Sequence, residues 1–148
     1  MIWRYDSGAA FLAENQAFLD TKPQISAFMA LDAPLLEKTD KINYAARCEK
    51  DGKTLLAMKV EPYHLQLFGD ADCAGELLDF LVRGGYEIQN YLSEKTLGDA
   101  AAREIEARFG IRYEEALTMA FMEARTLTEP SSPEVEAANE DDLDEIYA

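Results

Sequence analysis

The sequence predicts an α+β protein in which a mixed, mostly antiparallel sheet is flanked by helices. Two β-favourable runs, residues 43–49 and 54–61, flank Asp51-Gly52, and this dipeptide suits the positive backbone angles of a tight hairpin turn. Apolar residues recur at fourfold spacing over 97–109, as one face of a helix requires. Helical and strand-like segments alternate after the hairpin, which favours a layered fold.

Two helices are predicted before the hairpin. Asp6 and Ser7 are cap-forming residues, and the apolar residues after them fall on one face of a helix over about 7–20. Pro23 suits the first turn of a second helix, which Pro34 closes. We expect this second helix to turn four apolar side chains inward: Ile25, Phe28, Met29 and Leu31.

A third strand and a third helix are predicted after the hairpin. Residues 64–68 alternate leucines with other side chains and precede a glycine turn, which is typical of a strand. Asp72 is the expected cap of a helix over 73–83. Gly84 and Gly85 follow the leucine stripe of this helix and are expected to end it.

A strand, a helix and a last strand complete the predicted order. Residues 86–92 are β-favourable, and we expect them in the interior of the sheet. Thr96 is the expected cap of the next helix and Gly110 its end. Residues 114–125 alternate with apolar side chains on both faces, which predicts a long strand. Its exposed part, 115–125, leads to the hypothesis of a homodimer formed by edge pairing.

The chain is acidic, and its charge is unevenly placed. With 148 residues and 48% hydrophobic residues it has the length and composition of one folded domain. A net charge of -15 repels nucleic acid and anionic membranes, so neither is an expected partner. All 14 lysines and arginines lie at or before Arg125, and eight acids follow it. This acidic end is either a solvated segment or a surface for a basic partner.

Residues that could carry catalysis or bind metal are few. Cys48 and Cys73 are distant in sequence and form no C-x-x-C pair, so free buried thiols are expected rather than a zinc site or redox dithiol. His64 is the single histidine, and no nucleophile motif accompanies it, which favours a structural role. The chain has no signal peptide pattern and no apolar run near the ~18 residues of a membrane span, so a cytoplasmic location is expected.

The glycines of the sequence do not form a phosphate-binding pattern. Gly84 and Gly85 follow a predicted helix, whereas a phosphate-binding turn opens one. The turn after the strand over 86–92 offers Gly98, with Glu94 and Asp99 beside it. These carboxylates would repel a pyrophosphate.

Four segments of the chain resemble a known family. They are "YDSGAAFLAENQAFLDTKPQ", "LLAMKVEPYHLQLF", "LLDFLVRGGYEIQNYL" and "FGIRYEEALTMAFMEARTL". Together they resemble the N-terminal half of bacterial GNAT-superfamily N-acetyltransferases, which combine a degenerate, GNAT-like first domain with a catalytic second one. The resemblance implies a GNAT-like (acyl-CoA N-acyltransferase-like) fold. It also implies a GNAT-like N-terminal domain over 1–128, a linker over 129–133 and the start of a truncated catalytic domain over 134–148.

The resemblance further implies an acetyl-CoA-dependent N-acetyltransferase as the full-length protein. The family holds the pyrophosphate with a Gln/Arg-x-x-Gly-x-Gly/Ala turn, and residues 1–148 contain no such turn. We therefore expect no cofactor in this chain and assign no catalytic, cofactor-binding or metal-binding residue. Pro62, Tyr63 and His64 are the expected substrate or interdomain surface, and the expected partner is the chain's own catalytic domain. Two alternatives stay open: a free-standing acyl-CoA-dependent enzyme with a diverged loop over 93–99, and a free-standing acidic interaction module.

Overall fold

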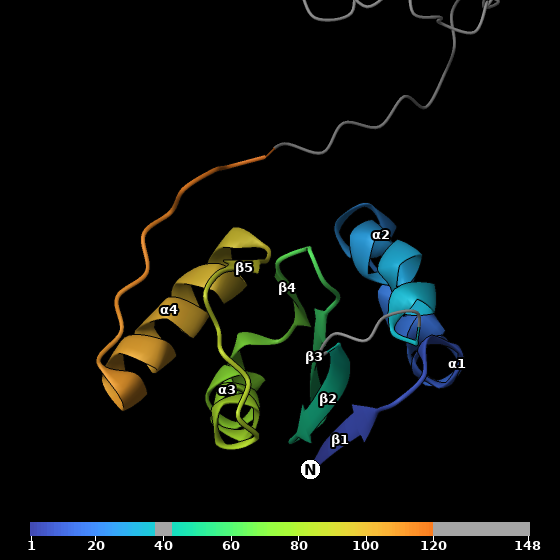
Figure 1. The fold of residues 1–148 in the computed structure, drawn as a ribbon, viewed down its shortest axis with the longest axis horizontal. Coiled ribbons are helices and arrows are strands. Elements are labelled where there is room, and N and C mark those ends of the chain that lie inside the picture. The colour runs from blue at the N-terminus through green and yellow to red at the C-terminus, as the bar shows by residue number, and fades with distance from the viewer. Residues whose placement is uncertain (38–42, 120–148) are drawn as a thin grey trace, which may run out of the picture.

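A computed structural model describes residues 1–37 and 43–119, and Figure 1 follows them along the chain. The elements are β1 (Ile2–Tyr5), α1 (Gly8–Leu19), α2 (Pro23–Asp32), β2 (Tyr44–Lys50), β3 (Lys53–Lys59), β4 (Leu65–Gly69), α3 (Ala74–Arg83), β5 (Tyr91–Leu92) and α4 (Lys95–Phe109). Short 3-10 turns lie at Ala33–Leu35 and Ala71–Cys73. Over these residues the fold is α+β, with a five-stranded mixed sheet and four α-helices.

The strands follow the order β1-β2-β3-β4-β5 across the sheet. The first three pairings are antiparallel, and β4 and β5 are parallel because α3 crosses over between them. The predicted hairpin is confirmed: Asp51 and Gly52 connect β2 to β3 with φ angles of 52° and 77°. In the parallel pair, Leu65 lies opposite Tyr91. The sheet is therefore mixed and mostly antiparallel, as predicted.

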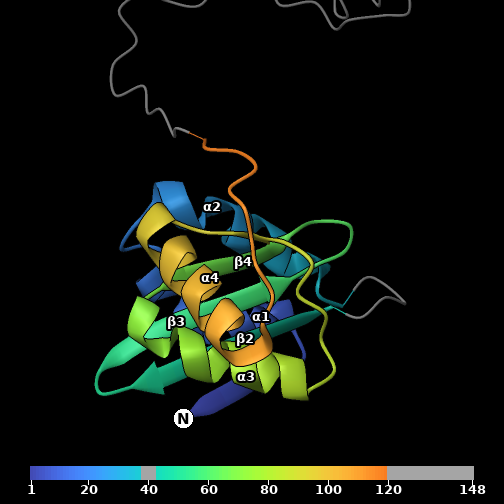
Figure 2. The same cartoon turned by 90° about the vertical axis from the view of Figure 1, so that its left-hand side faces the viewer.

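Helices cover both faces of the sheet. In Figure 1, α1 and α2 lie on one side of the strands and α3 and α4 on the other, and Figure 2 looks onto the second pair. Leu65 and Leu67 of β4 belong to the core under α3 and α4, whereas Phe68 belongs to the core under α1 and α2. This alternation is the predicted one. Burying a leucine side chain fully contributes about 1.5–3 kcal/mol, so these two cores are the main source of stability.

The helices α1 and α2 form largely as the sequence predicts. Ser7 caps α1, since its Oγ accepts a hydrogen bond of 3.0 Å from the Ala10 amide, and Pro23 is the first residue of α2. The expectation that four apolar side chains of α2 turn inward is wrong for two of them. Phe28 is 42% exposed and Leu31 is 71% exposed, because they lie on the side of α2 that faces away from the sheet.

Both other predicted helix caps are wrong. Asp72 belongs to the 3-10 turn before α3, where its carboxylate pairs with Lys53, and Cys73 is the residue that precedes α3. Thr96 is the second residue of α4 and not its cap, because that helix begins one residue earlier, after Glu94. Neither α3 nor α4 has a side-chain cap hydrogen bond. The Asp72 carboxylate, which the local pattern assigns to a helix cap, therefore forms an ion pair with Lys53 of β3 instead.

The predicted helix ends are confirmed. Gly84 follows the last residue of α3, and its amide donates to the Phe80 carbonyl at 3.0 Å. Gly110 follows α4 in the left-handed conformation, with φ 70°. The apolar stripe of α4 is buried at Leu97 and at the two positions four and eight residues later.

Two strands differ from the prediction. The strand β1 pairs with β2 and was not predicted, since its four residues are too few to show a period. The strand expected over 86–92 forms only at Tyr91–Leu92, and it is the edge of the described sheet rather than an interior strand. The preceding residues fold over the core instead, and the ring of Tyr86 packs on that of Tyr44 with 4.0 Å between centroids.

Residues 111–119 form no strand, although the sequence predicts one over 114–125. They run back beside α4 (Figure 1), and the ring of Tyr113 packs on that of Tyr91 in β5 with 5.2 Å between centroids. Leu117 is consequently 73% exposed. The rest of that predicted strand, the linker over 129–133 and the second-domain start over 134–148 lie outside the described residues.

Candidate functional site

The residues expected at the substrate or interdomain surface lie together in the loop between β3 and β4. Pro62, Tyr63 and His64 are all exposed, and the Tyr63 ring is 50% exposed. The peptide bond between Glu61 and Pro62 is cis. The Tyr63 amide donates to the Val60 carbonyl at 2.8 Å, which closes the turn. These residues form a surface and line neither of the two grooves described below.

His64 connects this loop to the segment that precedes β5. Its Nδ1 lies 2.7 Å from Oδ1 of Asn90, so Nδ1 carries the proton and donates. The contact lies beside the amino ends of the parallel strands, since β4 begins at Leu65 and β5 at Tyr91. A catalytic triad would require a carboxylate or a nucleophile as the partner of the imidazole. Within the described residues the partner of the imidazole is the Asn90 amide, so these residues do not form such a triad.

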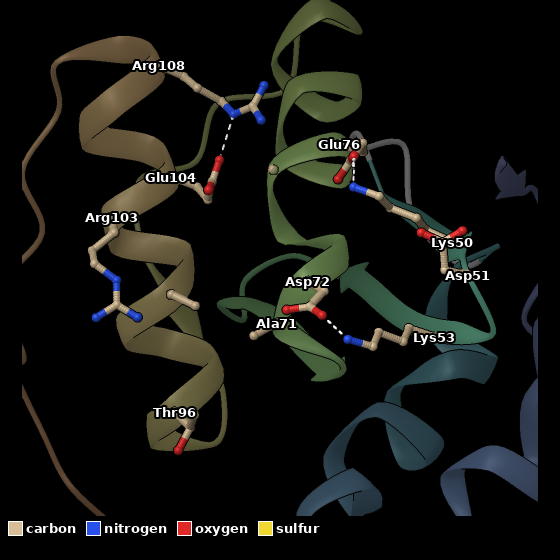
Figure 3. A pocket seen from close by; sticks show the side chains of 12 residues that line it. Lys50, Asp51, Lys53, Ala71, Asp72, Glu76, Thr96, Arg103, Glu104 and Arg108 are labelled. Atoms are coloured by element: carbon tan, nitrogen blue, oxygen red, sulfur yellow. Dashed lines mark hydrogen bonds and ion pairs between the residues drawn. The ribbon is translucent and has the colours of Figure 1, made fainter.

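A charged groove of about 570 Å³ lies between the β2–β3 hairpin, α3 and α4 (Figure 3). Its basic lining residues are Lys50, Lys53, Arg103 and Arg108. Its acidic lining residues are Asp51, Asp72, Glu76 and Glu104. The lining therefore carries four positive and four negative formal charges and is neutral overall.

Three of the four basic side chains in the charged groove form ion pairs. The pairs are Lys50 with Glu76, Lys53 with Asp72, and Arg108 with Glu104. The carboxylate of Glu76 raises the pKa of Lys50, and hydrogen bonding to the Lys50 ammonium lowers the pKa of Glu76. Arg103 has no ion-pair partner among residues 1–37 and 43–119. Within those residues the charged groove thus offers one unpaired cation, Arg103, and one unpaired acid, Asp51, in its lining, which is too little positive charge to hold a diphosphate.

The turn from β4 into α3 is closed by contacts with β3. Gly69 has a φ of 129°, and the Asp70 amide donates to the Thr54 carbonyl at 2.7 Å. The Thr54 amide donates in turn to Oδ2 of Asp70 at 3.2 Å. Asp72 adds a second carboxylate, paired with Lys53. An anion bound at a helix start needs free amides and no competing negative charge, and this turn has two carboxylates instead.

Polar groups of the turn from β5 into α4 also form ion pairs and hydrogen bonds within the chain. Glu94 precedes α4, and its carboxylate pairs with Lys22 at 2.8 Å. The Gly98 amide donates to the Glu94 carbonyl at 2.8 Å, and the Gly98 carbonyl accepts from the Tyr91 hydroxyl at 2.9 Å. Burial raises the pKa of Tyr91, so the hydroxyl remains protonated and donates this bond. The Glu94 carboxylate would repel a phosphate at the first turn of α4.

An apolar groove of about 410 Å³ lies between the C-terminal ends of α3 and α4 and the loop segments beside them. Its apolar and aromatic lining residues are Val82, Tyr86, Ile88, Ile105, Phe109, Ile111 and Tyr113. The Tyr113 hydroxyl donates to the Ile88 carbonyl and ties the two loop segments together. Ile111 is 50% exposed at this groove, and Glu87 is the one charged residue in its lining. Such a surface suits an apolar contact better than a polar substrate.

In residues 1–37 and 43–119, no three His, Cys, Asp or Glu side chains come together as metal ligands would. None of the helices formed by these residues combines the length and the apolar character that crossing a membrane demands.

The turns into α3 and α4 do not favour a pyrophosphate. It would meet carboxylates at the start of each helix, at Asp70, Asp72 and Glu94. Lys53, which lies beside the first of these turns, is paired with Asp72. No step of acetyl transfer is therefore assigned to residues of this chain.

Comparison of the chain with protein-family models, with curated proteins and with solved structures gave no match. Sequence reasoning predicted the loop over 62–64 but neither groove. The charged groove joins a hairpin to a helix about 50 residues later in the chain, as Lys53 and Arg103 illustrate, and local patterns carry no signal of such a distance. Glu104 and Arg108 are four positions apart in the sequence, and this spacing is typical of an ion pair on one face of a helix, here α4.

Proposed function

We propose that this chain is a non-catalytic, GNAT-like domain of a longer acetyl-CoA-dependent N-acetyltransferase, and that it supports the catalytic domain and shapes the substrate cleft. One observation carries the non-catalytic part. The turn between β4 and α3 holds Asp70 and Asp72 where a pyrophosphate would bind, and Asp70 is fixed by hydrogen bonds with Thr54. Such a turn repels the cofactor that the other domain would bind.

The GNAT-like part of the proposal is supported by the resemblance of four segments and by the architecture. A five-stranded mixed sheet with helices on both faces is compatible with such a fold. The family's cofactor turn lies between a strand and a helix, and the described residues contain three such turns, which enter α1, α3 and α4. All three carry carboxylates, at Asp6, at Asp70 and Asp72, and at Glu94, which is the expected condition of a domain that has lost cofactor binding.

The terminal strand β5 and the apolar groove support the proposed role in binding a second domain. The strand β5 is two residues long and has one neighbour, β4, in the described sheet. The apolar groove lies at the C-terminal ends of α3 and α4. Three of its lining residues, Ile88, Phe109 and Tyr113, also pack against the core under these two helices. A half-exposed apolar groove and a terminal strand of a sheet are each suited to contact with a second domain. A second copy of this chain is the alternative occupant, and light scattering after gel filtration distinguishes the two.

The test of the proposal begins with the coding sequence that follows Ala148. A frame that continues into strands and a Gln/Arg-x-x-Gly-x-Gly/Ala turn supports the proposal. A stop codon at that point contradicts the proposed second domain. Saturable binding of acetyl-CoA by residues 1–148 would contradict the non-catalytic part separately.

A second candidate function, an acidic interaction module, is favoured by the charge distribution. Eight acids and no basic residues follow Arg125, and they supply -8 of the net -15. Such a segment can attract a basic partner at a rate that depends on salt. Deleting residues 129–148 should then abolish capture of a basic protein such as lysozyme at low ionic strength. Capture that is unchanged by the deletion would reject this role.

A further inference from the structure

Residues 111–119 form a strap over one side of the apolar groove. They belong to no helix or strand, and among them only Tyr113 is not exposed. The strap runs back beside α4 from the end of that helix (Figure 1). Within the described parts of the chain, no backbone hydrogen bond joins it to another residue. The strap is therefore held in place by side chains.

Tyr113 is the side chain that fastens the strap. Its ring packs on that of Tyr91 in β5, with 5.2 Å between centroids and 56° between the ring planes. Its hydroxyl donates to the Ile88 carbonyl oxygen, and burial raises the pKa of Tyr113, so the hydroxyl keeps the proton that it donates. The ring also packs against the core under α3 and α4. One side chain thus joins the strap to β5, to the loop before it and to the core.

Ion pairs with α4 add little to the closure of the strap. Glu115 pairs with Lys95 at 2.8 Å, and both side chains are more than half exposed. Arg112 pairs with Glu106 at 2.7 Å, and the Arg112 side chain is largely exposed. Exposed pairs of this kind contribute little to stability, because water and salt screen them. Tyr113 is thus the main fastener of the strap.

Opening the strap should cost far less free energy than unfolding the domain. Ordering residues 111–119 costs conformational entropy at every position, and the contacts that offset this cost are concentrated at Tyr113. An open strap breaks these contacts and leaves the buried stripe of α4 in place, at Leu97, Ala101 and Ile105. Segments with few buried apolar contacts open locally, without global unfolding. The strap meets this description at every position but Tyr113.

We propose that the strap is a movable cover of the apolar groove, fastened by Tyr113, and that its release opens the groove while the domain stays folded. The strap contributes Ile111 and Tyr113 to the lining of the groove, and the other lining residues belong to α3, α4 and residues 85–89. Release also uncovers the ring of Tyr91 at the edge of the described sheet. Access of a second domain to this surface rests on the proposed function, but the opening of the strap does not.

Digestion of chain 1–148 with a small amount of trypsin tests the release of the strap. Arg112 lies in the strap, directly before Tyr113, whereas Arg83 is the last residue of α3. A protease cleaves an opened state in proportion to its population when opening and closing are fast. Cleavage after Arg112 therefore measures the open strap, and cleavage after Arg83 measures unfolding of α3. In the wild type, low concentrations of urea should raise the rate at Arg83 more than the rate at Arg112, because a local opening exposes less surface.

Substitutions of the fastener should act on the strap alone. Tyr113→Ala should raise the rate at Arg112 about tenfold or more, because it removes the ring pair with Tyr91, and should raise the rate at Arg83 less than about twofold. Tyr113→Phe keeps the ring and loses the hydrogen bond to Ile88, so a smaller increase is expected. Lys95→Gln, at the exposed ion pair, is the matched control and should change the rate at Arg112 less than about twofold. Each rate is divided by that of the synthetic peptide 106–119 with the same residue at position 113, which removes the effect of the substitution on trypsin itself.

The proposal is overturned if Tyr113→Ala leaves the rate at Arg112 unchanged, or if the rates at Arg112 and Arg83 rise by the same factor. It is equally overturned if the wild-type strap is cleaved as fast as the peptide, since the strap would then not be closed. An equal urea dependence of the two sites in the wild type overturns it even if a variant does not fold. A stop codon after Ala148 would reject the second domain and leave the strap standing, so the two failures are distinguishable.

Discussion

Gly69, the last residue of β4, lies against the backbone of Thr54 in β3. A Cβ atom at position 69 would lie 2.2 Å from the Thr54 carbonyl oxygen, and the backbone φ of Gly69 is 129°. The next residue, Asp70, exchanges two hydrogen bonds with the same Thr54. This close approach determines where β4 stops and where the acidic turn into α3 begins.

Replacing Gly69 with alanine should destabilise the chain strongly. The contact with Thr54 involves backbone atoms that cannot rotate away, so we expect a loss of about 3 kcal/mol in the free energy of unfolding, measured by urea denaturation. Gly85 is the matched control, because it also has a positive φ, 82°, but a Cβ there meets nothing within 4 Å. Gly85→Ala should cost only about 1 kcal/mol. Equal losses in the two variants would show that the contact with Thr54 is not the cause.

Asn15 of α1 is fully buried, and its replacement by alanine should cost about 2 kcal/mol, because polar partners are left unpaired. Its Nδ2 donates to the Phe11 carbonyl at 2.8 Å, and its Oδ1 accepts from Arg47 at 2.9 Å. Gln16 is the control on the same helix, since its side chain is exposed and bonds only to Asp20. Gln16→Ala should change the free energy of unfolding by less than about 0.5 kcal/mol. A loss for Gln16→Ala as large as that for Asn15→Ala would contradict this account.

Tyr44 should make the stability of the chain fall at alkaline pH. Burial raises its pKa above the ordinary value of about 10. Below that value both the folded and the unfolded state keep the proton. Above it the unfolded chain loses the proton while the folded chain retains it, so stability falls by up to about 1.4 kcal/mol per pH unit.

The variant Tyr44→Phe separates this effect from others. The Tyr44 hydroxyl is buried with no hydrogen-bond partner among the described residues, so its removal should leave stability at pH 7 unchanged or raise it by about 1 kcal/mol. Between pH 10 and 11 the variant should lose less stability than the wild type, as measured by urea denaturation at each pH. Tyr63→Phe, at a half-exposed ring, is the reference substitution. A parallel decline in wild type and Tyr44→Phe would show that other groups cause the alkaline loss.

Much of the fold follows from local patterns, and the failures have a common cause. The hairpin at Asp51-Gly52 and the end of α4 at Gly110 depend on backbone angles that a few neighbouring residues determine, so the sequence predicts them. The cap assigned to Asp72 failed because its carboxylate pairs with Lys53 of a distant strand. The strand over 86–92 was reduced to two residues because its pairing depends on β4 and not on its own β propensity.

The candidate site was less predictable than the fold. The sequence predicts Pro62, Tyr63 and His64 as a substrate or interdomain surface, which stays a prediction, but it does not predict the contact of His64 with Asn90. The charged groove arises where the parallel crossover brings α3 and α4 against the hairpin, and the apolar groove where the C-terminal ends of these two helices meet the loops that follow them. Such contacts depend on strand register and helix packing. The hydrophobic periodicity of a short segment carries no information about either.

Ile111 tests the proposed supporting role. In the product of the complete reading frame, Ile111→Asp places a charge in the apolar groove and should weaken the contact with the second domain. Limited proteolysis should then cleave between the domains at least several times faster. In chain 1–148 alone the same change should alter the free energy of unfolding by about 1 kcal/mol or less, because the side chain is half exposed. Leu31→Asp, at an exposed position of α2 on the other side of the sheet, is the control. Equal proteolysis of the two variants would reject the apolar groove as the interdomain surface.

The central claim is tested most directly by two calorimetric titrations with acetyl-CoA, one on chain 1–148 and one on the product of the complete reading frame. We predict no saturable heat from chain 1–148, because Asp70, Asp72 and Glu94 place negative charge at the turns into α3 and α4. We predict saturable binding by the longer protein. Saturable micromolar binding by chain 1–148, or no binding by either protein, would contradict the account.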